Sequence, residues 1–305
     1  MRCKAVPADF AGTQAPPLRE IVRAPKCDVV ARWGLDVIAR ELAPLLPGFT
    51  AHVVPSVDST NSELMRRARA GCVEPVLLVA EHQTAGRGRL GRSWHGTAAH
   101  DADRSRGGAG PAPGSLTFSL GLALGLEDWS GLSLAVGVSV ARSLDRRLRL
   151  KWPNDIWLQE RKLAGILIET VSVEQHRYVV IGVGINIAPC DCAGLAVPPA
   201  WLQELLPDLD APAALQRVVP ALVQAIRLFE TQGFAPFQAA FSACDLLRGR
   251  DVELSDGTQG VAAGVNDSGG LLVQTSRGLQ TITSAEVSVR PSGLMRLGGV
   301  EASRS

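Results

Sequence analysis

The chain has 305 residues, 46% of them hydrophobic, which is enough to bury one large core or two unequal ones. Its 31 Lys and Arg residues nearly balance its 30 Asp and Glu residues, so the overall charge gives no reason to expect nucleic acid or an anionic membrane as a partner. No apolar run reaches the roughly 20 residues of a membrane span, and the first residues lack the apolar core of a secretory signal. We therefore expect a cytoplasmic protein in which any anion is bound locally.

The first half of the chain predicts a loosely held extension over 1–27, where no hydrophobic periodicity is visible. The elements expected next are a helix over about 33–46, a strand over 49–54, a helix over 62–70 capped by Asp58-Ser59-Thr60-Asn61, and a strand over 75–81. Residues 97–114 contain no large apolar side chain, so we predict a flexible surface insertion there.

The second half continues with strands over 115–124, 148–158, 162–173 and 177–187 and helices over 130–147, 213–231 and 234–243. This order predicts an α+β fold, a mixed sheet layered with helices. From residue 248 to 290, short strands alternate with Gly-containing turns, which is typical of a small β-barrel. The predicted domains are residues 28–246 and 247–292, with a tail over 293–305.

Metal and nucleophilic chemistry have little support in the sequence. The six cysteines are irregularly spaced and only Cys190 and Cys192 lie close together, so we interpret them as reduced thiols rather than as a zinc site. The five histidines are dispersed and suggest no Ser-His-Asp or Cys-His arrangement.

Residues 81–96, EHQTAGRGRLGRSWHG, alternate Gly with Arg directly after an apolar strand. Backbone N–H groups flanked by guanidinium groups suit an anion, so we predict a phosphate-handling loop. The segment does not fit a Walker loop, and no helical pattern follows its formal match to GxGxxG, so a dinucleotide site is not favoured. The alternative is a solvated basic hairpin tip.

Residues 151–155, KWPND, interrupt a predicted strand, since Pro153 cannot donate to a ladder; Asn154 and Asp155 should project from a strand end. Mg²⁺ is commonly held by one or two carboxylates together with substrate phosphates, so Asp155 beside the arginine loop would make a nucleotide triphosphate site. The alternative is an Asx-type turn between strands.

Lys162 opens an apolar strand, where its ammonium group would point at whatever the loop holds and stabilise developing negative charge. A solvated edge lysine is the alternative. Gly182 and Gly184 interrupt a buried strand, which permits close approach of a ligand or marks a bulge.

These segments together resemble the bacterial biotin protein ligases, in the right order over about residues 50–290. The motifs that carry the resemblance are STN (59–61), GRGRLGRSW (86–94), KWPND (151–155), KLAGIL (162–167) and GVGIN (182–186). The resemblance implies a class II synthetase-like catalytic domain of the biotin/lipoate-ligase type, an SH3-like C-terminal barrel, and a monofunctional ligase. Only about 50 residues with one predicted helix precede the catalytic start, so we expect no DNA binding.

The reaction that the resemblance implies has two steps: biotin and MgATP give biotinyl-5′-adenylate and pyrophosphate, and biotin then passes to one lysine of a biotin carboxyl carrier protein. In the first step a carboxylate attacks a phosphate, so positive charge must surround two anions that repel each other. By resemblance, Arg89 and Lys162 are catalytic and Asp155 binds Mg²⁺.

The resemblance also divides the ligand contacts. Biotin would be held by Ser59, Thr60, Asn61, Gln83, Gly86, Arg87, Gly88, Trp94, Lys162 and Gly165. ATP and the adenylate would be bound by Arg87, Arg89, Arg92, Trp94, Lys151, Asn154, Asn186 and Arg290. Thr117 stands where an aromatic residue often lies near the nucleotide, so adenine packing would depend more on Trp94. Family members are monomers or homodimers, and the sequence does not decide between these states.

Two alternatives remain open. A lipoate or octanoate transferase shares the general fold and modifies a carrier lysine, but does not normally display GRGRxGRxW with KWPND. A repressor that binds biotinyl-adenylate and then DNA is disfavoured by the near-zero net charge and the absence of a basic helix.

Overall fold

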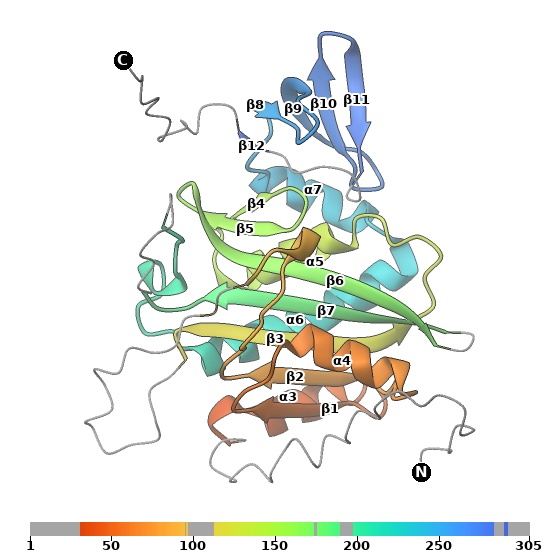
Figure 1. Cartoon of the computed structure of the whole chain (residues 1–305), viewed down its shortest axis with the longest axis vertical. Helices are drawn as coiled ribbons and strands as arrows, with labels where there is room; N and C mark the ends of the chain where they lie inside the picture. The colour runs from red at the N-terminus through yellow and green to blue at the C-terminus, as the bar shows by residue number, and fades with distance from the viewer. Residues whose placement is uncertain are drawn as a thin grey trace, which may run out of the picture.

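The computed structural model describes residues 31–94, 96, 113–173, 176–189, 198–283 and 290–291 (Figure 1). The predicted extension over 1–27, the tail over 293–305 and nearly all of the insertion over 97–114 lie outside these residues, as does the side chain of Arg290. None of the described helices is both long enough and apolar enough to cross a membrane.

The larger sheet has seven strands in the order β1-β2-β3-β7-β6-β5-β4. Their bounds are β1 Thr50–Val54, β2 Val76–Ala80, β3 Ser115–Leu124, β4 Arg149–Lys151, β5 Asp155–Leu158, β6 Arg161–Val173 and β7 His176–Asn186. The β1–β2 pair is parallel and every other pair is antiparallel, which confirms the mixed sheet of the predicted α+β fold.

One expected strand is wrong. The segment 148–158 forms two strands, β4 and β5, because the chain reverses at Trp152-Pro153-Asn154 and pairs Lys151 with Asp155. Pro153 has no N–H to contribute to a ladder, which suits the turn and not a continuous strand.

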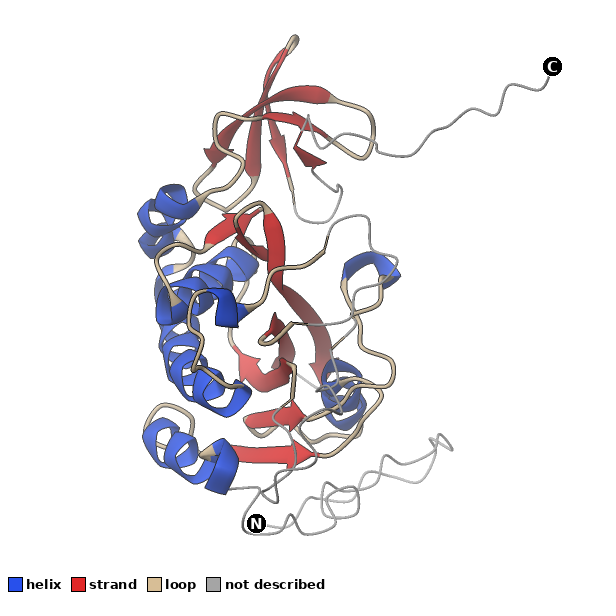
Figure 2. Cartoon of the chain, turned by 90° about the vertical axis from the view of Figure 1, so that its left-hand side faces the viewer, coloured by secondary structure: helices blue, strands red, loops and turns tan. Residues whose placement is uncertain are grey.

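The two faces of this sheet are covered unequally (Figure 2). On one face lie α3 Leu35–Leu42, α5 Leu132–Leu144, α6 Ala211–Gln232 and α7 Ala235–Cys244, which bury the larger core. On the other face, α4 (Thr60–Arg69) packs Leu64, Met65 and Ala68 against a smaller cluster. Among the described α-helices, α4 alone packs on this face, and the pocket described below lies at its N-terminus.

The C-terminal part forms a second, fully antiparallel sheet in the order β11-β10-β9-β8-β12. Its strands are β8 Asp251–Glu253, β9 Gln259–Val265, β10 Leu271–Thr275, β11 Gly278–Ile282 and β12 Arg290–Pro291. Figure 1 shows this sheet beyond the end of the larger sheet where β4 and β5 lie. The short strands and tight turns agree with the SH3-like architecture expected from the sequence.

Candidate active site

A pocket of about 210 Å³ opens at the N-terminus of α4. Its lining brings together residues from all five of the segments that the sequence singled out. Of the proposed ligand-binding residues whose side chains the structure describes, all line it except Gly86 and Asn186.

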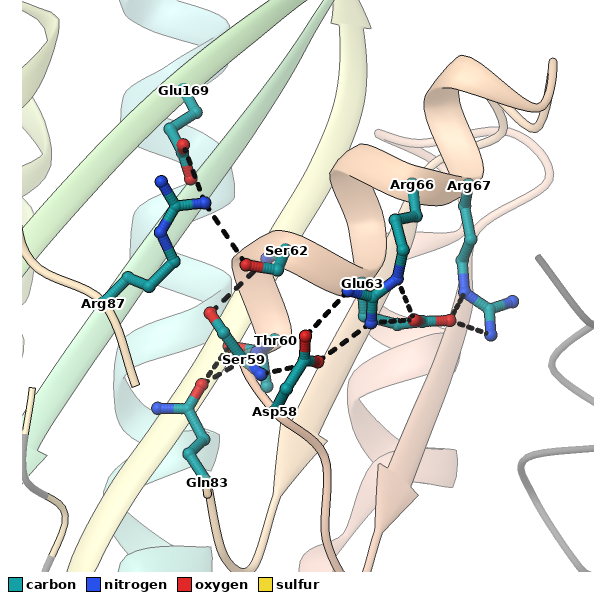
Figure 3. Close-up of polar contacts among 10 residues, drawn as sticks. All are labelled: Asp58, Ser59, Thr60, Ser62, Glu63, Arg66, Arg67, Gln83, Arg87 and Glu169. Atoms are coloured by element: carbon teal, nitrogen blue, oxygen red, sulfur yellow. Dashed lines mark hydrogen bonds and ion pairs between the residues drawn. The ribbon is translucent and has the colours of Figure 1, made fainter. Parts of the chain in front are cut away.

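At one end of the pocket, α4 begins with neutral polar side chains that are almost fully buried. Ser59 is the N-cap and its side chain accepts a hydrogen bond from the Ser62 amide. The Oε1 atom of Gln83 accepts from the Thr60 amide at 2.7 Å and from the Thr60 hydroxyl at 3.1 Å. The amide nitrogen of Gln83 is therefore the end that points away from α4 (Figure 3). We call Ser59, Thr60, Asn61 and Gln83 the neutral end.

Asn61 is fixed by partners from β3 and β6. Its Nδ2 atom donates to the Leu167 carbonyl at 3.2 Å and to Glu169 Oε2 at 3.0 Å, and its Oδ1 atom lies 2.6 Å from the Ser119 hydroxyl. Both amide donors are therefore used by acceptors of the protein, and the oxygen, which accepts from Ser119, keeps a second lone pair. Sequence reasoning missed Ser119 and Glu169. For Ser119 a signal existed, because it is a hydroxyl in the middle of a fully buried strand segment.

Two glycines in β7 make room for this arrangement. Gly182 pairs with Ser119 and Leu167, and a Cβ atom there would overlap Asn61 Oδ1. Gly184 lies two residues further along β7, where a Cβ atom would overlap the Trp94 indole. The ladders to β3 and β6 run through both positions without a register shift, so the glycines serve close approach and not a bulge.

The opposite end of the pocket is charged. Lys162 Nζ lies 2.8 Å from Asp155 Oδ1 and 5.9 Å from the Trp94 ring centroid. Arg89 donates to Asn154 Oδ1 at 3.2 Å. Burial lowers the pKa of Arg89, and the nearby Asp155 carboxylate opposes that shift. We call Arg89, Asn154, Asp155 and Lys162 the charged end.

The glycine-arginine loop is an irregular hairpin that joins the two ends. Gly88 N donates to Arg92 O at 2.7 Å and Trp94 N donates to Gly86 O at 2.9 Å, so Gly86 holds Trp94 without lining the pocket. At the tip Leu90 has a φ of 57° and is 70% exposed. The Leu90 side chain therefore contributes little packing at the tip.

Two further side chains lie at the margins. Arg87 reaches over α4, 3.4 Å from the Ser62 hydroxyl and 3.7 Å from a Glu169 oxygen (Figure 3). Asn186 is buried, donates to the Ala200 carbonyl at 3.1 Å and does not line the pocket.

Comparisons with known proteins agree with this geometry. Residues 110–186 match the Biotin/lipoate A/B protein ligase family, and residues 249–290 match the Biotin protein ligase C terminal domain. The chain is 33% identical to the Bifunctional ligase/repressor BirA of Escherichia coli over 290 residues, 85% of each protein. It is 35% identical to the Biotin--[acetyl-CoA-carboxylase] ligase of Paracoccus denitrificans over 243 residues, 75% of this chain and 96% of that one.

Among solved structures, the biotin protein ligase from Aquifex aeolicus in complex with biotin and ATP matches with a TM-score of 0.65 and 29% identity, covering 80% of this chain and 99% of that one. The mixed sheet carries a pocket with a neutral end and a charged end, and the C-terminal sheet follows it. Together with these matches, the fold and the site define a ligase of the biotin and lipoate class. Within that class, the chain belongs to the biotin protein ligase family.

Proposed function

We propose that this pocket joins biotin to ATP, giving biotinyl-5′-adenylate and pyrophosphate, and then transfers biotin to a lysine of a biotin carboxyl carrier protein. The observation that carries the proposal is the polarity of the pocket, with hydrogen-bonding groups fixed at the neutral end and cations at the charged end. This arrangement suits a ligand with an uncharged heterocycle at one end and a carboxylate at the other.

The neutral end would hold the ureido ring of biotin. Its buried N–H and C=O groups need partners, and Asn61 Oδ1 and the amide group of Gln83 supply an acceptor and a donor. Because Asn61 is already held by Ser119 and Leu167, and Gln83 by Thr60, little side-chain entropy is lost when biotin binds.

The charged end would bind the reacting groups. A biotin carboxylate oxygen attacks the α-phosphorus of ATP, a P–O bond forms, and the bond to the pyrophosphate oxygen breaks. Lys162 and Arg89 would place positive charge beside the pentacoordinate phosphorus, where negative charge accumulates. No enzyme nucleophile is required, since the adenylate is itself the activated species.

A magnesium ion fits this end as a companion of the nucleotide. The described residues contain no group of three His, Cys, Asp or Glu side chains that would form a protein cage for a metal. Mg²⁺ at nucleotide sites uses one or two carboxylates and completes its shell with phosphates and water, so Asp155 alone suffices. When bound, the ion would offset phosphate charge, and Asp155 would then exchange its contact with Lys162 for the ion.

In the second step the neutral carrier lysine amine attacks the carbonyl carbon of the mixed anhydride, a C–N bond forms, the C–O bond to AMP breaks with its electrons going to AMP, and the amine loses one proton to solvent. Lys162 and Arg89 would stabilise that phosphate as it departs. The arginine loop, with Trp94 against Gly184, would cover the anhydride and keep water from it.

Pyrophosphate exchange tests this function directly. The protein should incorporate labelled pyrophosphate into ATP only when biotin is present, and should label a purified carrier domain with biotin. Lipoate in place of biotin is the matched control for substrate class. Labelling by lipoate alone would assign the pocket to a lipoate ligase, and the absence of exchange with biotin would overturn the proposal.

A further inference from the structure

One buried hydrogen bond connects the charged end to the C-terminal sheet. The indole N–H of Trp152 donates to the Gly269 carbonyl at 2.9 Å, although the two residues are 117 positions apart. Trp152 is 2% exposed and lies in the turn between β4 and β5, directly before Pro153 and Asn154. Gly269 lies in the turn between β9 and β10.

The turn that presents the Gly269 carbonyl is held in place. Asn266 Oδ1 accepts from the Ser268 amide at 3.1 Å and from the Gly270 amide at 2.8 Å, and the Asn266 carbonyl accepts from Gly269. Gly269 has a φ of 79° and lies so close to α5 that an added Cβ atom would be 2.7 Å from the Gly131 Cα atom. Only glycine fits there, so the carbonyl meets Trp152 in a fixed position.

The same β4–β5 turn carries the partners of the catalytic cations. The Pro153 carbonyl accepts from the Ser133 hydroxyl of α5 at 3.1 Å. Asn154 donates to the Ile166 carbonyl at 2.7 Å, which turns its Oδ1 atom toward Arg89. Asp155 follows immediately and contacts Lys162. A shift of Trp152 would therefore move the partners of both cations.

The neutral end has no such connection within the described part of the chain. Thr60 and Asn61 hydrogen-bond to Gln83, Ser119 and groups of β6. None of these belongs to the C-terminal sheet.

We infer that Trp152 is a positioning residue through which the C-terminal sheet sets the geometry of the charged end, and that it acts on the nucleotide step and not on biotin binding. The inference rests on the proposed function, because it assumes that Arg89 and Lys162 face the phosphates. The contact is local: the exposed pair of Arg250 and Glu160 also joins the two parts of the chain, so removal of one indole N–H does not release the C-terminal sheet.

The substitution Trp152→Phe keeps an aromatic ring and removes the donor. We expect kcat/KM for ATP in biotin-dependent pyrophosphate exchange to fall about tenfold, mostly through KM, the size of effect that loss of one buried hydrogen bond produces. The biotin dissociation constant, measured by calorimetry, should stay within about twofold. The matched control is Trp129→Phe, because the Trp129 indole nitrogen is buried without a hydrogen-bond partner among the described residues. It should leave both quantities unchanged.

A purely structural role for Trp152 predicts a different pattern: a lower melting temperature and a lower active fraction, with kcat reduced and KM for ATP unchanged. That pattern would overturn the inference, as would equal losses of ATP and biotin affinity. If Trp152→Phe does not fold, Asn266→Ala carries the test. It loosens the Gly269 turn from within the C-terminal sheet and should raise KM for ATP selectively.

The wild-type measurement separates the two proposals. A wild-type protein that exchanges pyrophosphate normally, beside Trp152→Phe and Asn266→Ala variants with unchanged KM for ATP, overturns the inference alone. A wild-type protein without biotin-dependent exchange overturns the proposed function and this inference with it.

Discussion

The two ends of the pocket are built in opposite ways. At the neutral end, Ser59, Thr60 and Asn61 are 2–4% exposed and each is hydrogen-bonded within the protein. At the charged end the side chain of Lys162 is 41% exposed, and the neighbouring loop tip reaches 70% exposure at Leu90. Buried neutral groups can be satisfied by the protein itself, whereas at the charged end one carboxylate, Asp155, faces the two cations Lys162 and Arg89, and the ligand would supply the further anions. Protein groups therefore satisfy the neutral end before a ligand binds, but they neutralise the charged end only partly.

Removal of Lys162 should have the largest effect. Lys162→Ala deletes a cation that faces developing phosphate charge, so we expect the single-turnover rate of adenylate formation to fall about 10²- to 10³-fold, with a much smaller loss of biotin affinity. The control is Arg161→Ala in the same strand, which removes a neighbouring cation whose carboxylate partner is Glu204 outside the pocket. An unchanged adenylation rate in Lys162→Ala would remove this residue from the mechanism.

Disturbing the neutral end should cost biotin affinity instead. In Gly182→Ala the added methyl group would overlap Asn61 Oδ1 and displace the amide from Ser119 and Leu167. Loss of one or two ligand hydrogen bonds predicts a biotin dissociation constant about tenfold to hundredfold higher by calorimetry. Gly125→Ala, where an added Cβ atom meets nothing within 4 Å, is the control. Equal affinities for the two variants would contradict the close approach at Gly182.

The loop arginine should give a smaller effect confined to the nucleotide. Arg89→Ala removes a charged donor and its bond to Asn154, and we expect KM for ATP to rise about tenfold and the bound adenylate to be lost sooner. Its melting temperature should match that of the wild type, because a loop contributes little to the core. If the adenylate lifetime is unchanged, Arg89 does not retain it.

The sequence predicted one kind of feature well and another poorly. Strand and helix periodicity placed β3, α5 and α6, and the polar loops that follow the strands identified most of the pocket lining. These signals are local, since a strand end or an N-cap is written in a few consecutive residues. The sequence marked an interruption of 148–158 at Pro153, but not that the chain reverses there and pairs β4 with β5, because that pairing is a property of the folded chain.

A polar residue in an apolar strand, such as Ser119, can be noticed in the sequence, but the partners of the supporting side chains could not be predicted because they depend on register. Ser119 meets Asn61 only because β3 pairs with β7 so that Ser119 lies beside Gly182. Trp152 meets Gly269 across 117 residues. No spacing in the chain encodes either pairing, so the residues that hold the site emerge only from the folded structure.

The smallest effect should come from an ion pair that supports the start of α4. A hydrogen bond from Arg66 lowers the pKa of Asp58, whose backbone neighbour Ser59 caps the helix (Figure 3). Because the folded-state pKa lies below the unfolded value, the pair stabilises the protein above the ordinary pKa of aspartate and the stabilisation is lost as the pH falls toward the folded value.

Asp58→Asn removes this charge. We expect the melting temperature to be lower than that of the wild type at pH 6 and the difference to shrink as the pH falls below the ordinary aspartate pKa toward the lowered folded-state pKa, where the wild-type carboxylate is protonated. The gain at neutral pH should stay below about 1 kcal/mol, because both side chains are more than 40% exposed. A difference that does not shrink as the pH is lowered through this range would show that Asp58 acts through its hydrogen bond to Ser59 N, which an asparagine oxygen also makes, and not through its charge. A lower biotin affinity in the same variant would show that the neutral end depends on this pair, as the buried position of Ser59 implies.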